Sequence, residues 1–259
     1  MIQCLSSRPD RRSRARARGR RDARILLALA AMTALLSVDV PDALADPPLG
    51  VTVPAAADGT AGRVGALFAG GLDGGHFCTA SVVRSQDRDV VVTAAHCLGS
   101  LGTTFFAPGY RDGEAPYGLW KLTGMYVAPG WTEGEDPDED IAFATVAPLD
   151  GRRIEDVVGG FPVAAQQPGD AKVSIVGYPS REDSPLYCAN TTTLFSGTQR
   201  RIECPDLSGG TSGSPWLVDG ALAGVLGGYE GGGTVPEVSY SAVMGDQAVE
   251  LYREASDNG

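Results

Sequence analysis

The sequence predicts an all-β protein, a sandwich or barrels, with one helix at its C-terminal end. Short apolar or alternating runs are broken by Gly, Pro and Asp, which is typical of many short strands joined by turns. The 214 residues that follow a predicted leader are enough chain for two packed barrels. The runs expected to form strands are Val64–Phe68, Cys78–Val83, Val90–Thr93, Ile141–Val146, Val173–Val176, Trp216–Val218 and Leu222–Leu226.

The first 45 residues are predicted to be a secretory signal peptide. Nine arginines and no lysine lie between residues 8 and 24, and the 14-residue apolar run Ile25–Val38 follows them. The small-residue sequence Ala-Leu-Ala then ends at Ala45. A basic start, an apolar core and an A-x-A end are typical of a signal peptide, and 14 residues are too few to cross about 30 Å of hydrocarbon. We therefore expect cleavage after Ala45 and a secreted, extracellular protein, while the export route stays open.

The acidic balance of the remaining chain argues against two classes of partner. Loss of the leader removes nine arginines and four acidic residues, which leaves 12 basic and 28 acidic residues and a formal charge near −16. Nucleic acid and anionic membrane surfaces repel such a protein. We expect neither a nucleic-acid nor a membrane partner, and the charge says nothing about the chemistry.

Four of the five cysteines remain after cleavage and are expected to form two disulfides. An even number of cysteines in an exported chain with no CxxC pair favours disulfides over a metal site, so no metal is expected. Of the three possible pairings we predict Cys78–Cys97 and Cys188–Cys204, each of which closes a loop of fewer than 20 residues. Each bridge is worth about 3 kcal/mol in the chain-entropy model.

The two ends of the remaining chain differ from its strand-forming middle. Residues 46–62 are rich in Pro, Ala and Gly and have little periodicity, so they are interpreted as a flexible N-terminal arm or a short propeptide. At the other end, Asp246 is expected to cap a helix that runs as far as Ala255.

Two residue types with catalytic potential stand at the ends of predicted strands. His96 ends the β-forming run V-V-T-A-A-H-C, and imidazole is a base that works near neutral pH. A single histidine is more often structural, so this interpretation depends on partners. Asp140 opens D-I-A-F, where a carboxylate can accept the other imidazole N–H. Residues 133–140 hold six acids, which leaves Asp138 as an alternative.

The third candidate, Ser212, lies in the glycine-rich run G-G-T-S-G-S-P-W. Flanking glycines allow a sharp turn that exposes the hydroxyl, and they let a substrate carbonyl approach backbone N–H groups. The alternative is a Ser/Gly loop without function. A G-x-S-x-G motif is not complete, because Ser214 stands where the last glycine belongs. This weakens an α/β-hydrolase interpretation, in which the histidine also follows the serine.

Together, T-A-A-H-C, D-I-A-F and G-T-S-G-S-P resemble the signatures of the trypsin/chymotrypsin-like serine peptidases, in that family's order of His, Asp and Ser. The resemblance covers the chain from about residue 64 onward. The form G-T-S-G-S-P is similar to the sequence around the catalytic serine in bacterial secreted members of the family, such as the glutamyl-endopeptidase-like group. The resemblance implies two six-stranded antiparallel β-barrels with the active site in the cleft between them. An N-terminal barrel is then expected over 63–155, and a C-terminal barrel with the terminal helix over 156–259.

The resemblance also implies roles for the three candidates. His96 would be the general base and then the acid, Asp140 its orienting carboxylate, and Ser212 the nucleophile that forms an acyl-enzyme. The backbone N–H groups of Gly210 and Ser212 would form the oxyanion hole.

Further positions either match the family or depart from it. Cys78–Cys97 matches the family's bridge beside the histidine, and Cys188–Cys204 would brace the loop before the nucleophile. His76 matches a histidine often found before the first cysteine and is interpreted as structural. Thr211 stands where the animal enzymes have an aspartate that pairs with a newly freed N-terminus, so that zymogen switch cannot operate here.

Specificity is predicted from Asp206, six residues before Ser212, where trypsin-like members hold the aspartate that binds Arg or Lys. A carboxylate at the base of a buried pocket prefers a cation, although Asp206 could instead face water. The strand expected to wall the pocket includes Leu226, which offers no histidine of the kind that Glu-cleaving members use. The residues expected to bind substrate there are Gly227, Gly228 and Tyr229, and the last could obstruct the entrance.

These observations predict a secreted serine endopeptidase that acts on protein or peptide substrates, with a possible preference for Arg or Lys. It is expected to be a monomer and to need no cofactor. The alternative from another class is a catalytically silent protein that uses the same fold to bind partners.

Overall fold

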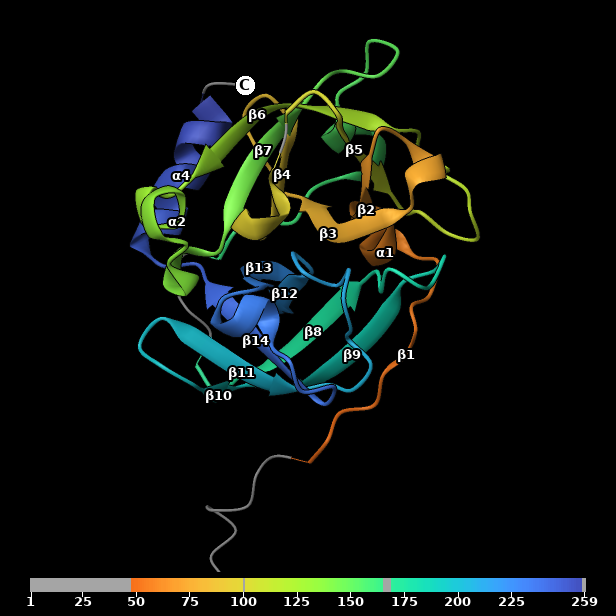
Figure 1. Ribbon diagram of the computed structural model, residues 1–259. Helices are drawn as coiled ribbons and strands as arrows, with labels where there is room; N and C mark the ends of the chain where they lie inside the picture. The colour runs from red at the N-terminus through yellow and green to blue at the C-terminus, as the bar shows by residue number, and fades with distance from the viewer. Residues whose placement is uncertain (1–47, 100, 165–168, 258–259) are drawn as a thin grey trace, which may run out of the picture. The chain divides into compact units, whose positions relative to one another are not determined.

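The computed structural model describes residues 48–99, 101–164 and 169–257, so the predicted signal peptide lies outside the described residues. The described chain is mostly β, as predicted, and its strands form two sheets (Figure 1). Every strand ladder in the two sheets is antiparallel.

The first sheet closes into a six-stranded barrel in the order β2-β3-β4-β7-β6-β5. Its strands are β2 (Val64–Ala69), β3 (His76–Val82), β4 (Val90–Thr93), β5 (Thr104–Pro108), β6 (Trp120–Val127) and β7 (Ala142–Val146). In β4, Val91 packs with Phe106 and Trp120, whereas Val90 and Val92 belong to the apolar cluster that reaches the second sheet. Because successive side chains of a strand face opposite sides, a strand covered on both sides is apolar throughout.

The second sheet has the order β1-β9-β8-β12-β13-β14-β11-β10. Its six longer strands are β8 (Lys172–Gly177), β9 (Leu186–Thr191), β11 (Gln199–Glu203), β12 (Pro215–Val218), β13 (Ala221–Leu226) and β14 (Val238–Val243), and the two-residue strands β1 (Val53–Pro54) and β10 (Thr193–Leu194) end it. Among the described strands, no ladder joins the two ends of this sheet. The Cys188–Cys204 disulfide and a hydrogen bond from Asn190 Nδ2 to the Glu203 carbonyl (2.9 Å) connect β9 to the end of β11 instead.

The described part of the predicted N-terminal arm is hydrogen-bonded to the second sheet. β1 pairs with β9, the Gly50 N–H donates to the Glu203 carbonyl (2.8 Å), and Thr52 Oγ1 donates to the Pro205 carbonyl (2.5 Å). The short helix α1 (Gly59–Arg63) follows, and the Asp58 carboxylate caps it. Edge pairing needs only main-chain groups, so a segment whose larger apolar side chains, Leu49, Val51 and Val53, stay exposed can still attach to a strand.

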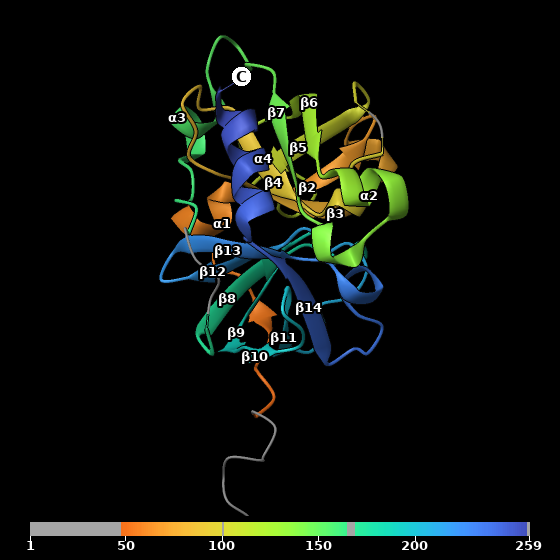
Figure 2. The same cartoon turned by 90° about the vertical axis from the view of Figure 1, so that its left-hand side faces the viewer.

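The predicted C-terminal helix is present as α4 (Asp246–Asp257), with the expected cap residue Asp246 as its first residue, and it packs on the first barrel (Figure 2). Leu251 is buried, and the Tyr252 ring lies 5.7 Å from that of Phe143. The sequence did not predict the shorter elements, which are α2 (Pro129–Gly134), α3 (Ile154–Val158), η2 (Leu72–Gly74), η3 (Ala95–Cys97), η4 (Pro137–Glu139) and η5 (Tyr229–Gly232). Within the described residues, no helix has the length and apolar character needed to cross a membrane.

Candidate active site

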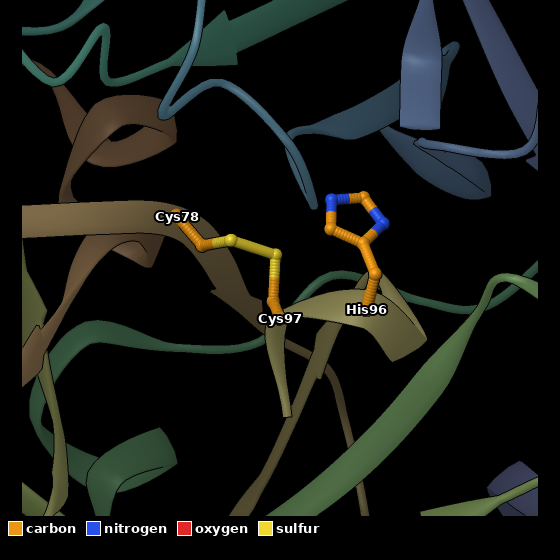
Figure 3. A group of neighbouring side chains, drawn as sticks. All are labelled: Cys78, His96 and Cys97. Atoms are coloured by element: carbon orange, nitrogen blue, oxygen red, sulfur yellow. A yellow bond between two sulfur atoms is a disulfide. The ribbon is translucent and has the colours of Figure 1, made fainter. Parts of the chain in front are cut away.

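His96 is held at the end of β4 by its neighbour in the chain. It lies in the 3₁₀ turn η3, and the next residue, Cys97, is bonded to Cys78 of β3 as predicted (Figure 3). The imidazole remains 27% exposed, so a substrate can reach it. The disulfide therefore anchors the turn while the ring stays accessible.

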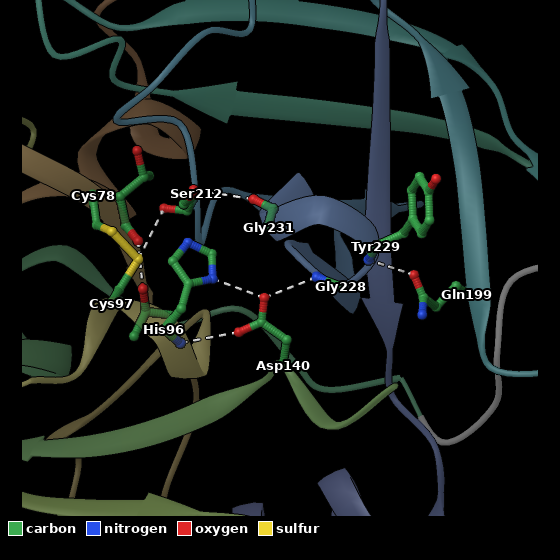
Figure 4. Close-up of polar contacts among 11 residues, drawn as sticks. Cys78, His96, Cys97, Asp140, Gln199, Ser212, Gly228, Tyr229 and Gly231 are labelled. Atoms are coloured by element: carbon green, nitrogen blue, oxygen red, sulfur yellow. Dashed lines mark hydrogen bonds and ion pairs between the residues drawn. A yellow bond between two sulfur atoms is a disulfide. The ribbon is translucent and has the colours of Figure 1, made fainter. Parts of the chain in front are cut away.

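The Asp140 carboxylate orients the imidazole from the buried side. Asp140 is 0% exposed, and its Oδ2 lies 2.7 Å from His96 Nδ1 (Figure 4). The same oxygen accepts the Gly228 N–H (2.8 Å), and Oδ1 accepts the His96 backbone N–H (3.0 Å). A carboxylate only accepts, so the neutral ring carries its proton on Nδ1 and leaves Nε2 as a free base.

The alternative acid, Asp138, is engaged elsewhere. It is exposed, and its Oδ1 accepts a hydrogen bond from Gln199 Nε2 at 2.6 Å. Of the acids between residues 133 and 140, the structure therefore places Asp140 against the imidazole.

Ser212 comes from the second sheet's side of the site and lies beside the His96 ring in Figure 4. Its carbonyl oxygen is 3.8 Å from Cys97 Sγ, which places the two turns in contact. Among the described residues, the hydroxyl has one hydrogen-bond partner, the Gly231 carbonyl, at a long distance of 3.5 Å. Hydrogen bonds of catalytic groups are often long in free enzymes and shorten when substrate binds.

The two N–H groups predicted to form an oxyanion hole have no hydrogen-bond acceptor among the described residues. Across the described part of the chain, neither the Gly210 nor the Ser212 N–H donates a hydrogen bond. Gly210 has φ of +97°, and a Cβ there would lie 2.4 Å from Ser180 Oγ. Only glycine fits that turn without strain.

A cleft of about 680 Å³ opens at Ser212. Asp206 lines it, as predicted, but this residue is exposed at a turn with φ of +66°. The sequence missed the wall formed by the segment after β8. The lining residues include Arg181, Glu182, Leu186, Leu226, Gly232 and Val235.

The other three predicted substrate-binding residues do not line this cleft. Gly227 packs its backbone on Asp140, where a Cβ would lie 2.8 Å from Oδ2, and Gly228 donates to the same carboxylate. The Tyr229 ring is 5.0 Å from that of Phe195 and 5.1 Å from that of Tyr240, so it does not obstruct the entrance.

The segment after β8 is attached to the first barrel by aromatic residues. His76 Nε2 donates to the Glu182 carbonyl (3.0 Å), which agrees with the structural role expected of this histidine. The Tyr110 hydroxyl donates to Asp183 Oδ1 (3.0 Å). Burial, with a smaller contribution from Asp183, raises the pKa of Tyr110 to about 12.

Cys78, His96 and Cys97 are the one group in the described residues whose ligand atoms cluster closely enough for a metal ion, within 4.8 Å. The two sulfurs are bonded to each other, so neither can act as a thiolate ligand (Figure 3). A single imidazole is then left, and this donor set does not fit a metal centre.

A hydroxyl, an imidazole and a buried carboxylate brought together by two antiparallel β modules are the arrangement of the two-barrel serine peptidases. The chain belongs to the trypsin family, which matches residues 55–241. The family resemblance predicted from three short motifs is therefore confirmed.

One curated relative is similar to part of the chain. The "Extracellular metalloprotease" of Bacillus subtilis (strain 168) is 28% identical over 144 residues, which are 53% of this chain and 45% of that protein. The chain thus spans about half the length of this curated relative.

Solved structures match a larger share of the chain. The protease Anisep from Arthrobacter nicotinovorans has a TM-score of 0.69 at 27% identity, and the matched region covers 80% of this chain and 100% of the Anisep chain. The thermostable serine protease AL20 from an extremophilic microorganism has a TM-score of 0.68 at 28% identity, with 78% and 100% covered. A Glu endopeptidase, at 18% identity, shares the fold with a TM-score of 0.66 over 81% of this chain and 98% of its own.

Proposed function

We propose that the protein is a secreted serine endopeptidase that hydrolyses peptide bonds through an acyl-enzyme on Ser212. The observation that carries this proposal is the 2.7 Å contact between His96 Nδ1 and the fully buried Asp140. That contact leaves Nε2 as a base on the side of the ring where Ser212 lies.

The reaction follows from these positions. Nε2 of His96 takes the proton of Ser212 Oγ as the oxygen attacks the scissile carbonyl carbon. The resulting oxyanion accepts hydrogen bonds from the free N–H groups of Gly210 and Ser212. His96 then gives its proton to the departing amine, and the ester remains on Ser212. A water molecule, deprotonated by His96, hydrolyses that ester and restores the hydroxyl.

A modest preference for Arg or Lys is part of the proposal. Asp206 and Glu182 place carboxylates along the cleft that holds Ser212, and both residues are exposed. Exposed ion pairs contribute at most about 1 kcal/mol, which corresponds to about fivefold in rate. Arg181 on the same cleft opposes the attraction, so Asp206 is expected to bias the choice of substrate without dictating it.

Secretion is supported by three features of the chain and its relatives. Both disulfides have formed, the B. subtilis relative is named extracellular, and the N-terminal sequence has the pattern of a signal peptide. An entrance blocked by Tyr229 would favour the catalytically silent alternative, but that ring packs on Phe195 and Tyr240.

Cleavage of an internally quenched peptide library tests the proposed function. We expect the purified protein to cleave internal bonds, and Ser212→Ala, with an unchanged melting temperature, to cleave none. Equal cleavage by the two proteins would assign the activity to a contaminant and reject the proposal.

A further inference from the structure

All four carbonyl groups of the turn from Gly209 to Ser212 accept hydrogen bonds. The donors are Ser180 N–H and Oγ to Gly209 (2.8 and 3.0 Å), Thr79 Oγ1 to Gly210 (3.0 Å), Ser214 N–H and Oγ to Thr211 (3.0 and 2.6 Å), and Thr79 N–H to Ser212 (2.8 Å). In a trans peptide the N–H points away from the C=O of the same unit. The free Gly210 N–H shares its peptide unit with the Gly209 carbonyl, and the free Ser212 N–H shares its unit with the Thr211 carbonyl, so Ser180 and Ser214 fix the direction of these two N–H groups directly. The Gly210 carbonyl, which Thr79 holds, belongs to the peptide unit between them.

Thr79 differs from the other donors because it belongs to the first barrel. It lies in β3, is 0% exposed, and does not line the cleft at Ser212. It contacts the turn at two places, through its N–H and through its hydroxyl. Its own carbonyl accepts Thr93 Oγ1 at 2.7 Å, which fixes Thr79 to the end of β4.

The direction of the Thr79 hydroxyl proton is determined by its surroundings. Thr79 Oγ1 accepts the backbone N–H of Tyr178 at 2.9 Å. The hydroxyl proton is then available for the Gly210 carbonyl, and the side chain is held between one donor and one acceptor. The backbone of Thr79 is also packed closely against the turn. A Cβ at Gly213 would lie 2.1 Å from the Thr79 carbonyl oxygen.

We propose that the Thr79 side chain is a positioning residue for the reaction proposed above. Its hydroxyl holds the Gly210 carbonyl, whose peptide unit lies between the units that carry the Gly210 and Ser212 N–H groups, and by fixing this middle unit it keeps both N–H groups aimed at the substrate oxygen. This inference rests on the proposed function, because it assigns an effect on a reaction at Ser212. Loss of the hydroxyl leaves the Gly210 carbonyl and the Tyr178 N–H without partners and lets the turn rotate.

The test compares Thr79→Val with Thr79→Ser. Valine keeps the shape but loses both side-chain hydrogen bonds, whereas serine keeps them. Removal of one oxyanion donor costs about 10²–10³ in kcat, and a misaligned pair should cost about 10–100-fold. We expect that fall in kcat for Thr79→Val with KM within about twofold, and recovery to within about threefold in Thr79→Ser.

Inhibitor binding separates positioning from a general structural effect. A peptide aldehyde forms a tetrahedral adduct with an oxyanion, so its affinity for Thr79→Val should fall by the same factor as kcat/KM. The product peptide forms no such adduct, and its affinity should not change. Thr145→Val is the matched control: Thr145 is a buried threonine of β7 whose hydroxyl contacts Thr123 Oγ1 (3.1 Å), and its kcat should stay within about twofold of wild type.

Each outcome decides the proposal. A folded Thr79→Val variant with wild-type kcat, or one in which aldehyde and product binding weaken equally, overturns the role of Thr79 and leaves the proposed function standing. A wild-type protein that neither cleaves peptides nor binds the aldehyde overturns both. If Thr79→Val does not fold, Thr79→Ala, which also lacks the hydroxyl, carries the same test with the same expected result.

Discussion

Replacement of Asp140 by asparagine changes one oxygen to an amide nitrogen without changing the shape of the site. In the native protein the carboxylate accepts three hydrogen bonds, from His96 Nδ1, the His96 backbone N–H and the Gly228 N–H. An asparagine can satisfy them only in part. With its oxygen at the Oδ2 position, the amide NH₂ faces the His96 backbone N–H, and two donors oppose each other.

The reverse orientation of the amide removes the base. With NH₂ at the Oδ2 position, it opposes the Gly228 N–H and must donate to His96 Nδ1. The imidazole proton then moves to Nε2, where a base is needed to accept the Ser212 proton. A wrong tautomer of this kind costs about 10⁴ in kcat, which corresponds to about 5.4 kcal/mol. The buried donor pair also lowers the free energy of unfolding by about 1–3 kcal/mol.

The assay is the steady-state cleavage of a peptide substrate by Asp140→Asn and Asp138→Asn. We expect kcat to fall about 10⁴-fold for Asp140→Asn, while Asp138→Asn stays within about twofold because that side chain is exposed and contacts Gln199. Melting temperatures report whether both variants are folded. An Asp140→Asn variant with kcat within tenfold of wild type, or a larger loss for Asp138→Asn, would show that Asp140 does not set the tautomer of His96.

Two further predictions concern stability and specificity. Folding raises the pKa of Tyr110 from its ordinary value near 10 to about 12. The contribution of the protonated hydroxyl to the free energy of unfolding is therefore fully present below pH 10, and this free energy should fall by up to about 3 kcal/mol between pH 10 and 12. Denaturant unfolding should show a smaller fall for Tyr110→Phe, and identical losses in the two proteins would contradict the assignment. Asp206→Asn should lower kcat/KM for Arg and Lys peptides by no more than about fivefold relative to uncharged ones, because the carboxylate is exposed. A loss of a hundredfold or more would mean that Asp206 is desolvated when substrate binds.

The parts of the site that the sequence predicted are those encoded within one short segment. His96 and Ser212 could be predicted because their chemistry depends on neighbours in the chain, an apolar strand end for one and flanking glycines for the other. The choice between Asp138 and Asp140 could not be made from the acid cluster alone. It depends on the Gly228 N–H, which the fold brings to Asp140.

The parts that sequence reasoning missed depend on contacts between distant segments. Tyr229 was expected at the pocket entrance, but Phe195 and Tyr240 hold its ring, and no local pattern links those three residues. The cleft wall at Glu182 is positioned by His76 of the first barrel. The short helices α1 to α3 have five or six residues, too few for a helical period to appear in the sequence.

Labelling with a fluorophosphonate probe tests whether Ser212 is a nucleophile activated by His96. We expect mass spectrometry to locate a single adduct on Ser212 of the purified, disulfide-bonded protein. The adduct should be absent from Ser212→Ala and strongly reduced in His96→Ala, because the base is then missing. If the folded wild-type protein gains no adduct, or if His96→Ala gains it equally well, Ser212 is not a nucleophile activated by His96.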